Sequence, residues 1–190
     1  MDAGESSGVD EVTYSSLDEI YEDKAEVLEE IDATLTPLTP SQLAYRPLPG
    51  AWSIAEIAEH LSIVETGQLR MLRVLTEKAE AGGKRPAPVS ITLDERFRDS
   101  AAGKIKARQQ NEPTGAVAAA DSLANLLTIQ TGLGELRPRL ERVDVASVTF
   151  AHPVLGDLSL GQWLAFVGMH EERHLRQMRG VMASPGFPRA

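Results

Sequence analysis

Four stretches of the 190-residue sequence place apolar residues at helical spacing, and these stretches constrain the fold most strongly. They cover about residues 15–35, 53–82, 114–142 and 159–180. Each stretch carries an apolar stripe, which a soluble protein must bury against other elements. We therefore predict an all-α protein that folds as a four-helix bundle in a single domain.

Local signals define the ends of these helices. The sequences SIAE at residues 53–56 and SLGQ at residues 159–162 are capping boxes, which begin the second and fourth helices. Pro138 interrupts the third stretch and predicts a weak second half for that helix. The proline-rich residues 36–50 are expected to form an ordered loop, and residues 144–157 an extended one.

The connection between the second and third helices is unusually long. It covers residues 82–112 and contains one short candidate strand or turn, VSITL, at residues 89–93. Antiparallel neighbours need only a short loop, whereas a connection of this length can cross the whole bundle and leave its two helices parallel. The long crossover therefore favours the order up-down-down-up.

Charge and composition divide the chain into three parts. Residues 1–32 contain twelve acidic side chains and one lysine, so the net charge of −9 is concentrated there. We expect residues 1–12 to be a flexible acidic tail, residues 13–182 to be the helical domain and residues 183–190 to be a flexible C-terminal tail. The sequence does not define a role for the crossover at residues 82–112.

The composition also excludes several kinds of function. The chain contains no cysteine, which excludes disulfides, thiolate metal ligands and a cysteine nucleophile. No basic stripe indicates a nucleic-acid partner. No apolar run approaches 18 residues and the N-terminus lacks an apolar core, so neither a membrane span nor a signal peptide is expected. These features predict a cytoplasmic protein.

The segment His170-Glu171-Glu172-Arg173-His174 matches H-E-x-x-H, the zinc signature of many metalloproteases. Such proteases take a third ligand from further along the chain. After His174 the sequence contains no His, Asp or Glu. The protease interpretation therefore fails, and any third ligand must precede the motif.

Both histidines of this motif lie on the apolar face of the fourth helix, one turn apart, where two imidazoles can share a metal ion. The alternative is a pair of core histidines satisfied by hydrogen bonds. His60 lies ~10 Å into the second helix, and His170 and His174 lie ~15 and ~9 Å from the end of the fourth. If these two helices are antiparallel, the three histidines lie at the same depth, as the order up-down-down-up requires.

Four further side chains are candidates for supporting roles. Glu171 borders the apolar face and is a candidate general base, although a solvated carboxylate is the simpler interpretation. Glu65 and Gln177 could orient a ligand histidine. His152 precedes Pro153 in the extended loop, and a position near the end of the bundle is favoured over a second-shell or substrate-binding role.

The blocks RPLPGAWSIAEIAEHL (46–61) and HPVLGDLSLGQWLAFVGMHEERHLRQM (152–178) resemble the DinB-like superfamily of small metal-binding four-helix proteins. The resemblance implies that His60, His170 and His174 bind a divalent metal, zinc or nickel. It also implies frequent homodimers. Some members of the family are described as metal-dependent hydrolases, and others transfer low-molecular-weight thiols such as mycothiol, bacillithiol or glutathione.

We therefore expect a metal-dependent enzyme that activates a low-molecular-weight thiol or a water at a three-histidine site. Because the chain lacks cysteine, a thiol would have to be a cofactor. The expected partners are a small-molecule substrate and a second copy of the chain, without nucleic acid or membrane. The alternatives are a non-catalytic metal-binding or stress-associated dimeric helical module and a plain bundle with core histidines and no metal.

Overall fold

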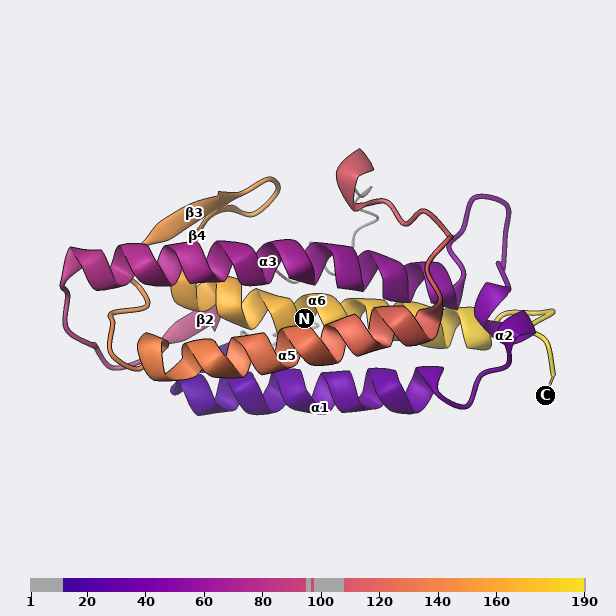
Figure 1. The fold of residues 1–190 in the computed structure, drawn as a ribbon, viewed down its shortest axis with the longest axis horizontal. Helices are drawn as coiled ribbons and strands as arrows, with labels where there is room; N and C mark the ends of the chain where they lie inside the picture. The colour runs from indigo at the N-terminus through magenta and orange to yellow at the C-terminus, as the bar shows by residue number, and fades with distance from the viewer. Residues whose placement is uncertain (1–11, 95–96, 98–107, 190) are drawn as a thin grey trace, which may run out of the picture.

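The computed structural model describes residues 12–94, 97 and 108–189. Four long helices lie side by side and form the body of the molecule (Figure 1). They are α1 (Leu17–Leu35), α3 (Ile54–Gly82), α5 (Ala119–Leu140) and α6 (Leu160–Met182). The predicted four-helix bundle is thus confirmed. Residues 1–11 of the expected acidic tail lie outside the described residues.

The helices follow the order up-down-down-up. In Figure 1, α1 and α6 run in one direction, and α3 and α5 run in the other. α3 packs against both α5 and α6, and α1 packs mainly against α6. The connection between Gly82 and Ala119 joins two parallel helices, as predicted for a long crossover. Its described part contains strand β2 (Ile91–Leu93) and the short 3₁₀ helix η1 (Gln109–Asn111).

Both predicted capping boxes are present. The Ser53 hydroxyl accepts a hydrogen bond from the backbone N–H of Glu56, whose carboxylate accepts one from the Ser53 N–H. Ser159 and Gln162 make the same reciprocal pair at the start of α6. The third helix begins at Ala119, five residues later than expected, and continues through Pro138 to Leu140. Pro138 lies within the last turn, so the hydrogen bond that it cannot donate is one of the last of the helix.

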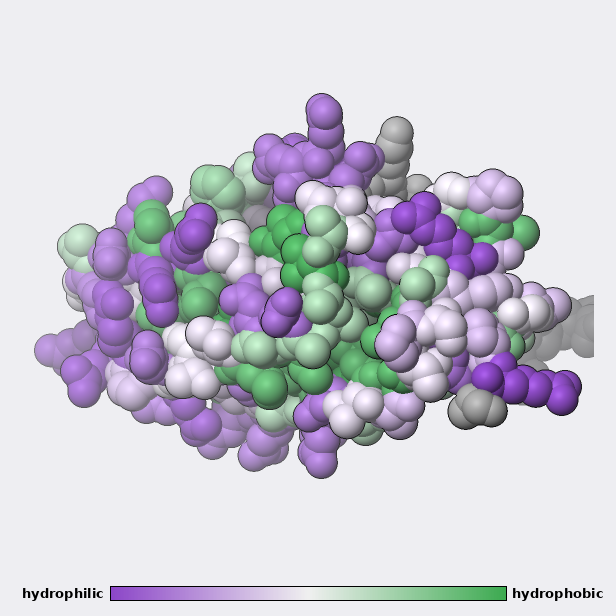
Figure 2. Space-filling view, turned by 45° about the vertical axis from the view of Figure 1, so that its right-hand side comes forward, coloured by the Kyte–Doolittle hydropathy of each residue, from purple (hydrophilic) through white to green (hydrophobic). Residues whose placement is uncertain are grey.

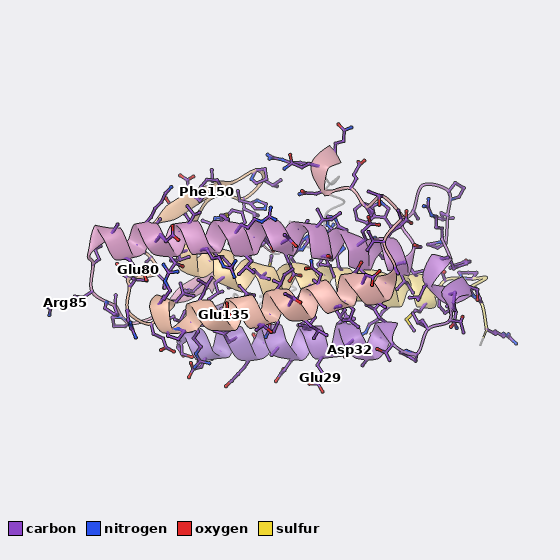
Figure 3. All side chains as sticks on the ribbon, in the orientation of Figure 1. Glu29, Asp32, Glu80, Arg85, Glu135 and Phe150 are labelled. Carbon is purple, nitrogen blue, oxygen red and sulfur yellow. The ribbon has the colours of Figure 1, made fainter. Side chains whose placement is uncertain are left out.

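The apolar stripes of the helices meet in one core of leucine, isoleucine and valine side chains. Most acidic residues of α1 are exposed, and Figure 3 shows Glu29 on the outer side of the helix. On the face shown in Figure 2, apolar side chains gather in patches between hydrophilic ones. Exposed apolar side chains include Leu48, Phe150 and Val154.

The proline-rich segment 36–50 contains a short helix that the sequence analysis did not predict, α2 (Pro40–Ala44). Thr39 and Gln42 form a capping box at its start. Residues 183–189 of the expected C-terminal tail lie against α2. The Gln42 amide donates to the carbonyl oxygen of Pro188 at 3.0 Å, and the aromatic ring of Phe187 packs edge-on against Tyr45.

Two small antiparallel pairs of strands accompany the bundle. β1 (Val12–Tyr14) pairs with β2, which confirms the candidate strand at 89–93. The segment predicted as an extended loop, 144–157, instead contributes most of a hairpin formed by β3 (Thr149–His152) and β4 (Gly156–Ser159). Gly156 has φ +76°, the left-handed conformation that closes a three-residue hairpin turn.

Among the helices that the structure describes, none combines the length and the apolar character needed to cross a bilayer.

Candidate metal centre

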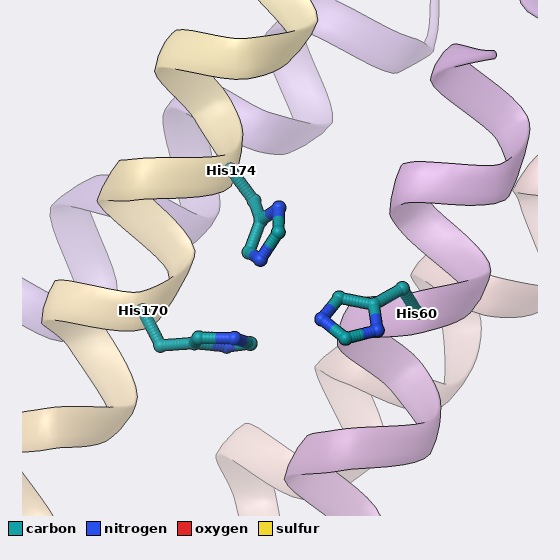
Figure 4. Close-up of side chains that lie close together, drawn as sticks. All are labelled: His60, His170 and His174. Atoms are coloured by element: carbon teal, nitrogen blue, oxygen red, sulfur yellow. The ribbon is translucent and has the colours of Figure 1, made fainter. Parts of the chain in front are cut away.

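Three histidines from two antiparallel helices converge inside the bundle. His60 projects from α3, and His170 and His174 project from successive turns of α6 (Figure 4). One ring nitrogen from each lies within 4.8 Å of the other two. A tetrahedral ion with Zn–N bonds of about 2.1 Å holds its ligand nitrogens roughly 3.4 Å apart, so small side-chain rotations would bring the three into ligand geometry.

Hydrogen bonds fix the tautomer of two of these histidines. Nδ1 of His60 lies 2.7 Å from the backbone carbonyl oxygen of Asn111, and Nδ1 of His174 lies 2.9 Å from Oε1 of Gln177. Both partners are acceptors, so each Nδ1 carries the proton and donates it. The lone pair of each ring is therefore on Nε2, as in histidines that bind metal through Nε2.

The residue next to His60, Glu59, anchors the chain just after Asn111. The Glu59 carboxylate accepts hydrogen bonds from Thr114, through its backbone N–H at 2.9 Å and its hydroxyl at 2.6 Å, and from the N–H of Gly115 at 2.8 Å. Burial opposes ionisation of Glu59, but these bonds outweigh it and lower the pKa of its carboxyl group. Adjacent positions of α3 thus present one metal-ligand candidate and anchor the segment that orients it.

His170 differs from the other two histidines. Its Nδ1 is buried and has no hydrogen-bond partner among the described residues. A buried polar atom without a partner is costly, and a metal ion would offset that cost. Burial is also the main cause that lowers the pKa of all three rings, well below the usual value for His170 and to about 3 for His174. The rings are therefore neutral at pH 7, the form that binds metal.

Arg173 lies between the two histidines of α6 and contacts one of them. Its Nη1 is 3.1 Å from Nε2 of His174, where it donates to the ring lone pair. The Arg173 side chain is half-buried. A metal ion at this lone pair would compete with the guanidinium group for the same nitrogen.

A pocket of about 330 Å³ opens beside the three histidines. α3 and α6 form its walls, and the β3–β4 hairpin and η1 contribute its rim. Its lining is mainly apolar and includes Val64, Met71 and Phe166. His170 and Arg173 also line the pocket, so a molecule bound there would lie next to the histidine cluster.

His152 lies on the hairpin at this pocket, whereas the sequence analysis favoured a position near the end of the bundle. Its ring packs against Phe166, with ring centroids 4.9 Å apart. Its Nδ1 accepts from the backbone N–H groups of Val154 and Leu155 at 3.2 and 3.1 Å. Neutral His152 therefore carries its proton on Nε2.

Glu65 and Glu171 lie in a buried cluster with Lys24 of α1, away from the pocket lining. The Lys24 ammonium is 2.8 Å from Oε1 of Glu171 and 3.7 Å from Oε2 of Glu65. Burial is the main cause that raises the pKa of both carboxyl groups, and Lys24 partly opposes it. Glu171 thus faces α1, so the role of general base that its place in the motif suggested is not assigned to it. Glu65 likewise contacts Lys24 rather than orienting a histidine.

Sequence reasoning missed three contributors to this region. Lys24 could have been identified from the sequence, because it is the only basic residue among the first 32 and lies on the apolar, buried face of α1. Arg173 lies inside the H-E-x-x-H motif, but its direction depends on its side-chain conformation. The role of the Asn111 carbonyl group could not be predicted from the sequence, because every residue has a backbone carbonyl group.

The family assignment rests on the length of chain that matches. Residues 25–178, which include all three histidines, match the model of the DinB superfamily. The chain belongs to the DinB superfamily. Among its relatives, the uncharacterized protein YuaE of Bacillus subtilis (strain 168) is 27% identical over 148 residues, which are 77% of this chain and 87% of YuaE.

Two solved structures share the fold seen here. TT2238, a four-helix bundle protein, has a TM-score of 0.60 and 22% identity, over 87% of this chain and 99% of its own. YfiT from Bacillus subtilis, described as a probable metal-dependent hydrolase with an unusual four-helix bundle topology, has a TM-score of 0.56 and 17% identity, over 87% of this chain and 85% of its own. At these identities the likeness shows the fold alone.

Proposed function

We propose that His60, His170 and His174 bind one divalent metal ion, and that this DinB protein is a metal-dependent enzyme acting on a small molecule in the adjoining pocket. The observation that carries the proposal is the convergence of three imidazoles, two of them buried and one partly buried, beside a pocket. The tautomers of His60 and His174 and the unpartnered Nδ1 of His170 support it.

The donor set fits a catalytic rather than a structural metal. Three neutral imidazoles leave at least one coordination position for water or substrate. A divalent ion there would supply the Lewis acidity that activates a water or a thiol. The description of YfiT as a probable metal-dependent hydrolase favours water. A thiol cofactor is the alternative that the resemblance to thiol-transferring members of the family implies.

The chain's own residues would position and shield the reacting molecule. Gln177 and the Asn111 carbonyl group hold two of the rings in fixed orientations. Phe166, Met71 and Val64 exclude water from one side of the pocket. The Nε2–H of His152 is a hydrogen-bond donor at the rim.

Elemental analysis of the purified protein tests the metal site. We expect about one divalent ion per chain in the wild type and its loss in His60→Ala, because two ligands on one helix bind weakly without the third. His152→Ala is the matched control, since it removes a histidine that lies outside the cluster, and it should keep the metal. Metal retained in His60→Ala at the wild-type level would contradict the assignment.

Turnover assays then separate the reaction classes. Conversion of electrophiles only when a low-molecular-weight thiol is present would identify a transferase, and ester or amide cleavage without thiol would identify a hydrolase. A protein that holds its metal but is inactive in both screens would instead support the non-catalytic metal-binding module.

A further inference from the structure

A buried glutamine in the wall of the pocket beside the histidines has an amide oxygen without a hydrogen-bond partner. Gln68 lines this pocket from α3 and is only 6% exposed. Its Oε1 is buried and makes no hydrogen bond to any of the described residues. Such an oxygen is costly, because it has lost the water that would solvate it. The proposed metal site uses three histidines and gives the Gln68 side chain no role.

His152 supplies a hydrogen-bond donor to the same pocket from the β3–β4 hairpin. Its Nδ1 accepts from the backbone N–H groups of Val154 and Leu155, so the proton of the neutral ring is on Nε2. Burial, and to a smaller extent Arg108, lowers the pKa of the ring and favours this neutral form. The hairpin turn thus uses one ring nitrogen, and the Nε2–H is available to a ligand.

Both groups are displaced from the histidine cluster in the same direction. Gln68 follows His60 by eight residues, which is ~12 Å along α3. The ring of His152 packs against Phe166, which precedes His170 by one turn of α6, or ~6 Å. Because α3 and α6 are antiparallel, a later position in α3 and an earlier position in α6 lie toward the same end of the bundle. One molecule could therefore contact Gln68 and His152 at one end and the histidine cluster at the other.

We propose that Gln68 and His152 form an uncharged hydrogen-bonding subsite, which binds the carboxamide group of a small and otherwise apolar molecule. A carboxamide has the complementary pair of groups, because its carbonyl oxygen accepts from the Nε2–H of His152 and its N–H donates to Oε1 of Gln68. Val64, Met71 and Phe166 contact the apolar body. The pocket volume of about 330 Å³ lies at the small end of the range for small-molecule sites. This proposal rests on the proposed function, because it names the class of molecule that the metal site would act on.

Four ligands of nearly equal shape separate the two hydrogen bonds. Benzamide can make both, acetophenone keeps only the carbonyl acceptor, and α-methylstyrene has neither group. Benzoate, the acid of the same shape, is included because Arg108 and Arg173 also line the pocket. Each ligand would be titrated into the isotopically labelled full-length protein, with zinc and after chelation, and binding followed by NMR. The side-chain amide signal of Gln68, assigned by its loss in Gln68→Met, reports contact with the ligand directly.

We expect acetophenone to bind roughly 3- to 10-fold more tightly than α-methylstyrene, which is the range for one neutral hydrogen bond. His152→Asn should remove this preference, because it removes the Nε2–H. Asparagine keeps an acceptor for the hairpin turn, since its side chain accepts from the backbone N–H two residues further on. Gln68→Met should lower the ratio of benzamide affinity to acetophenone affinity by a similar factor. It should leave the preference for acetophenone over α-methylstyrene unchanged.

Gln130→Met is the matched control for the glutamine. Gln130 also has a buried amide oxygen without a partner among the described residues, but it belongs to α5 and does not line the pocket. This variant should keep all four affinities. Circular dichroism would verify that each variant is folded.

Three results would overturn the proposal. Affinity ratios that do not change in Gln68→Met, or that change equally in Gln130→Met, would show that the Gln68 amide does not contact the ligand. Benzoate bound more tightly than benzamide would show that charge selects the ligand, and benzamide that leaves the Gln68 signal unshifted would remove the subsite. Metal content, measured on the same samples, tests the proposed function separately. Absence of metal with the preference retained would contradict only the proposed function, and metal retained without the preference would contradict only the subsite.

Discussion

At the scale of single residues, two of the three histidines are oriented by hydrogen bonds from Nδ1, the ring nitrogen that faces away from the cluster. His174 donates from Nδ1 to Gln177, one turn along α6, and His60 donates to the Asn111 carbonyl group. Each bond fixes both the orientation of the ring and the nitrogen that carries the lone pair. These two imidazoles therefore already have the tautomer that the proposed metal site requires.

Replacing Gln177 by Ala should weaken metal binding by roughly 10- to 100-fold, because His174 would lose the acceptor that fixes its tautomer. The side chain of Gln177 is exposed, so little loss of stability should accompany the change. Competition with a fluorescent zinc chelator would measure the affinity. Gln177→Glu is the matched control, since it keeps an acceptor at the same place and should bind at least as tightly as the wild type. Equal weakening in both variants would show that the bond to His174 is not the cause.

At the scale of elements, a buried ionic cluster connects α1 to the helix that carries two of the histidines. Lys24 contacts Glu171, the residue that follows His170, and lies 3.7 Å from Glu65 of α3. Close helix approach makes this contact possible, because a Cβ atom at Gly168 would lie only 3.3 Å from the Lys24 backbone. The cluster therefore joins three of the four helices near the histidine cluster.

Removing different members of this cluster should have opposite effects on stability. Lys24→Met leaves two buried carboxyl groups without a cation and should lower the free energy of unfolding by about 3 kcal/mol at pH 7. Glu65→Gln mimics the protonated acid. Because the folded-state pKa of Glu65 is raised above its ordinary value, its proton stabilises the fold at low pH, and this stabilisation is lost as the pH rises.

The Gln variant should therefore gain stability relative to the wild type as the pH rises above about 4.5, by at most about 1.4 kcal/mol per pH unit. Urea unfolding of the metal-free proteins at several pH values would measure the difference. Glu29→Gln, a change at an exposed position of α1, is the matched control and should leave the difference between Glu65→Gln and the wild type unchanged. Parallel curves for Glu65→Gln and the wild type would mean that Glu65 is ionised in the folded protein.

The elements that the sequence predicted are those with long-range periodicity or an explicit cap. All four helices were found this way, and Ser53 and Ser159 marked two of their starts. The hairpin at Thr149–Ser159 was missed because its strands are four residues long and mostly exposed, so they show no buried alternation. The helix at Pro40–Ala44 was missed because prolines dominate its surroundings, although Thr39 and Gln42 form a capping box.

At the scale of the whole molecule, the arrangement of the helices creates the histidine cluster. The depths of His60 in α3 and of His170 and His174 in α6 coincide only if these helices are antiparallel, and the structure has them so. The sequence contained enough to predict this meeting. The position of His152 could not be predicted from the sequence. It depends on the β3–β4 hairpin, in which His152 pairs with Gly156, and this hairpin was not predicted.

Because the three histidines meet only in the folded bundle, a metal ion bound to them should stabilise the whole molecule. Free zinc or nickel at 100 times its dissociation constant should add about 2.7 kcal/mol, which for a domain of this size raises the melting temperature by roughly 5–10 °C. Calorimetry of the chelated protein, with and without added metal, would measure the shift.

Magnesium is the control ion, since it prefers oxygen ligands and should produce no shift. His60→Ala should lose the shift with zinc or nickel, because only two ligands from a single helix remain and metal binding no longer joins α3 to α6. A shift that persists in His60→Ala would place the stabilising metal elsewhere in the molecule.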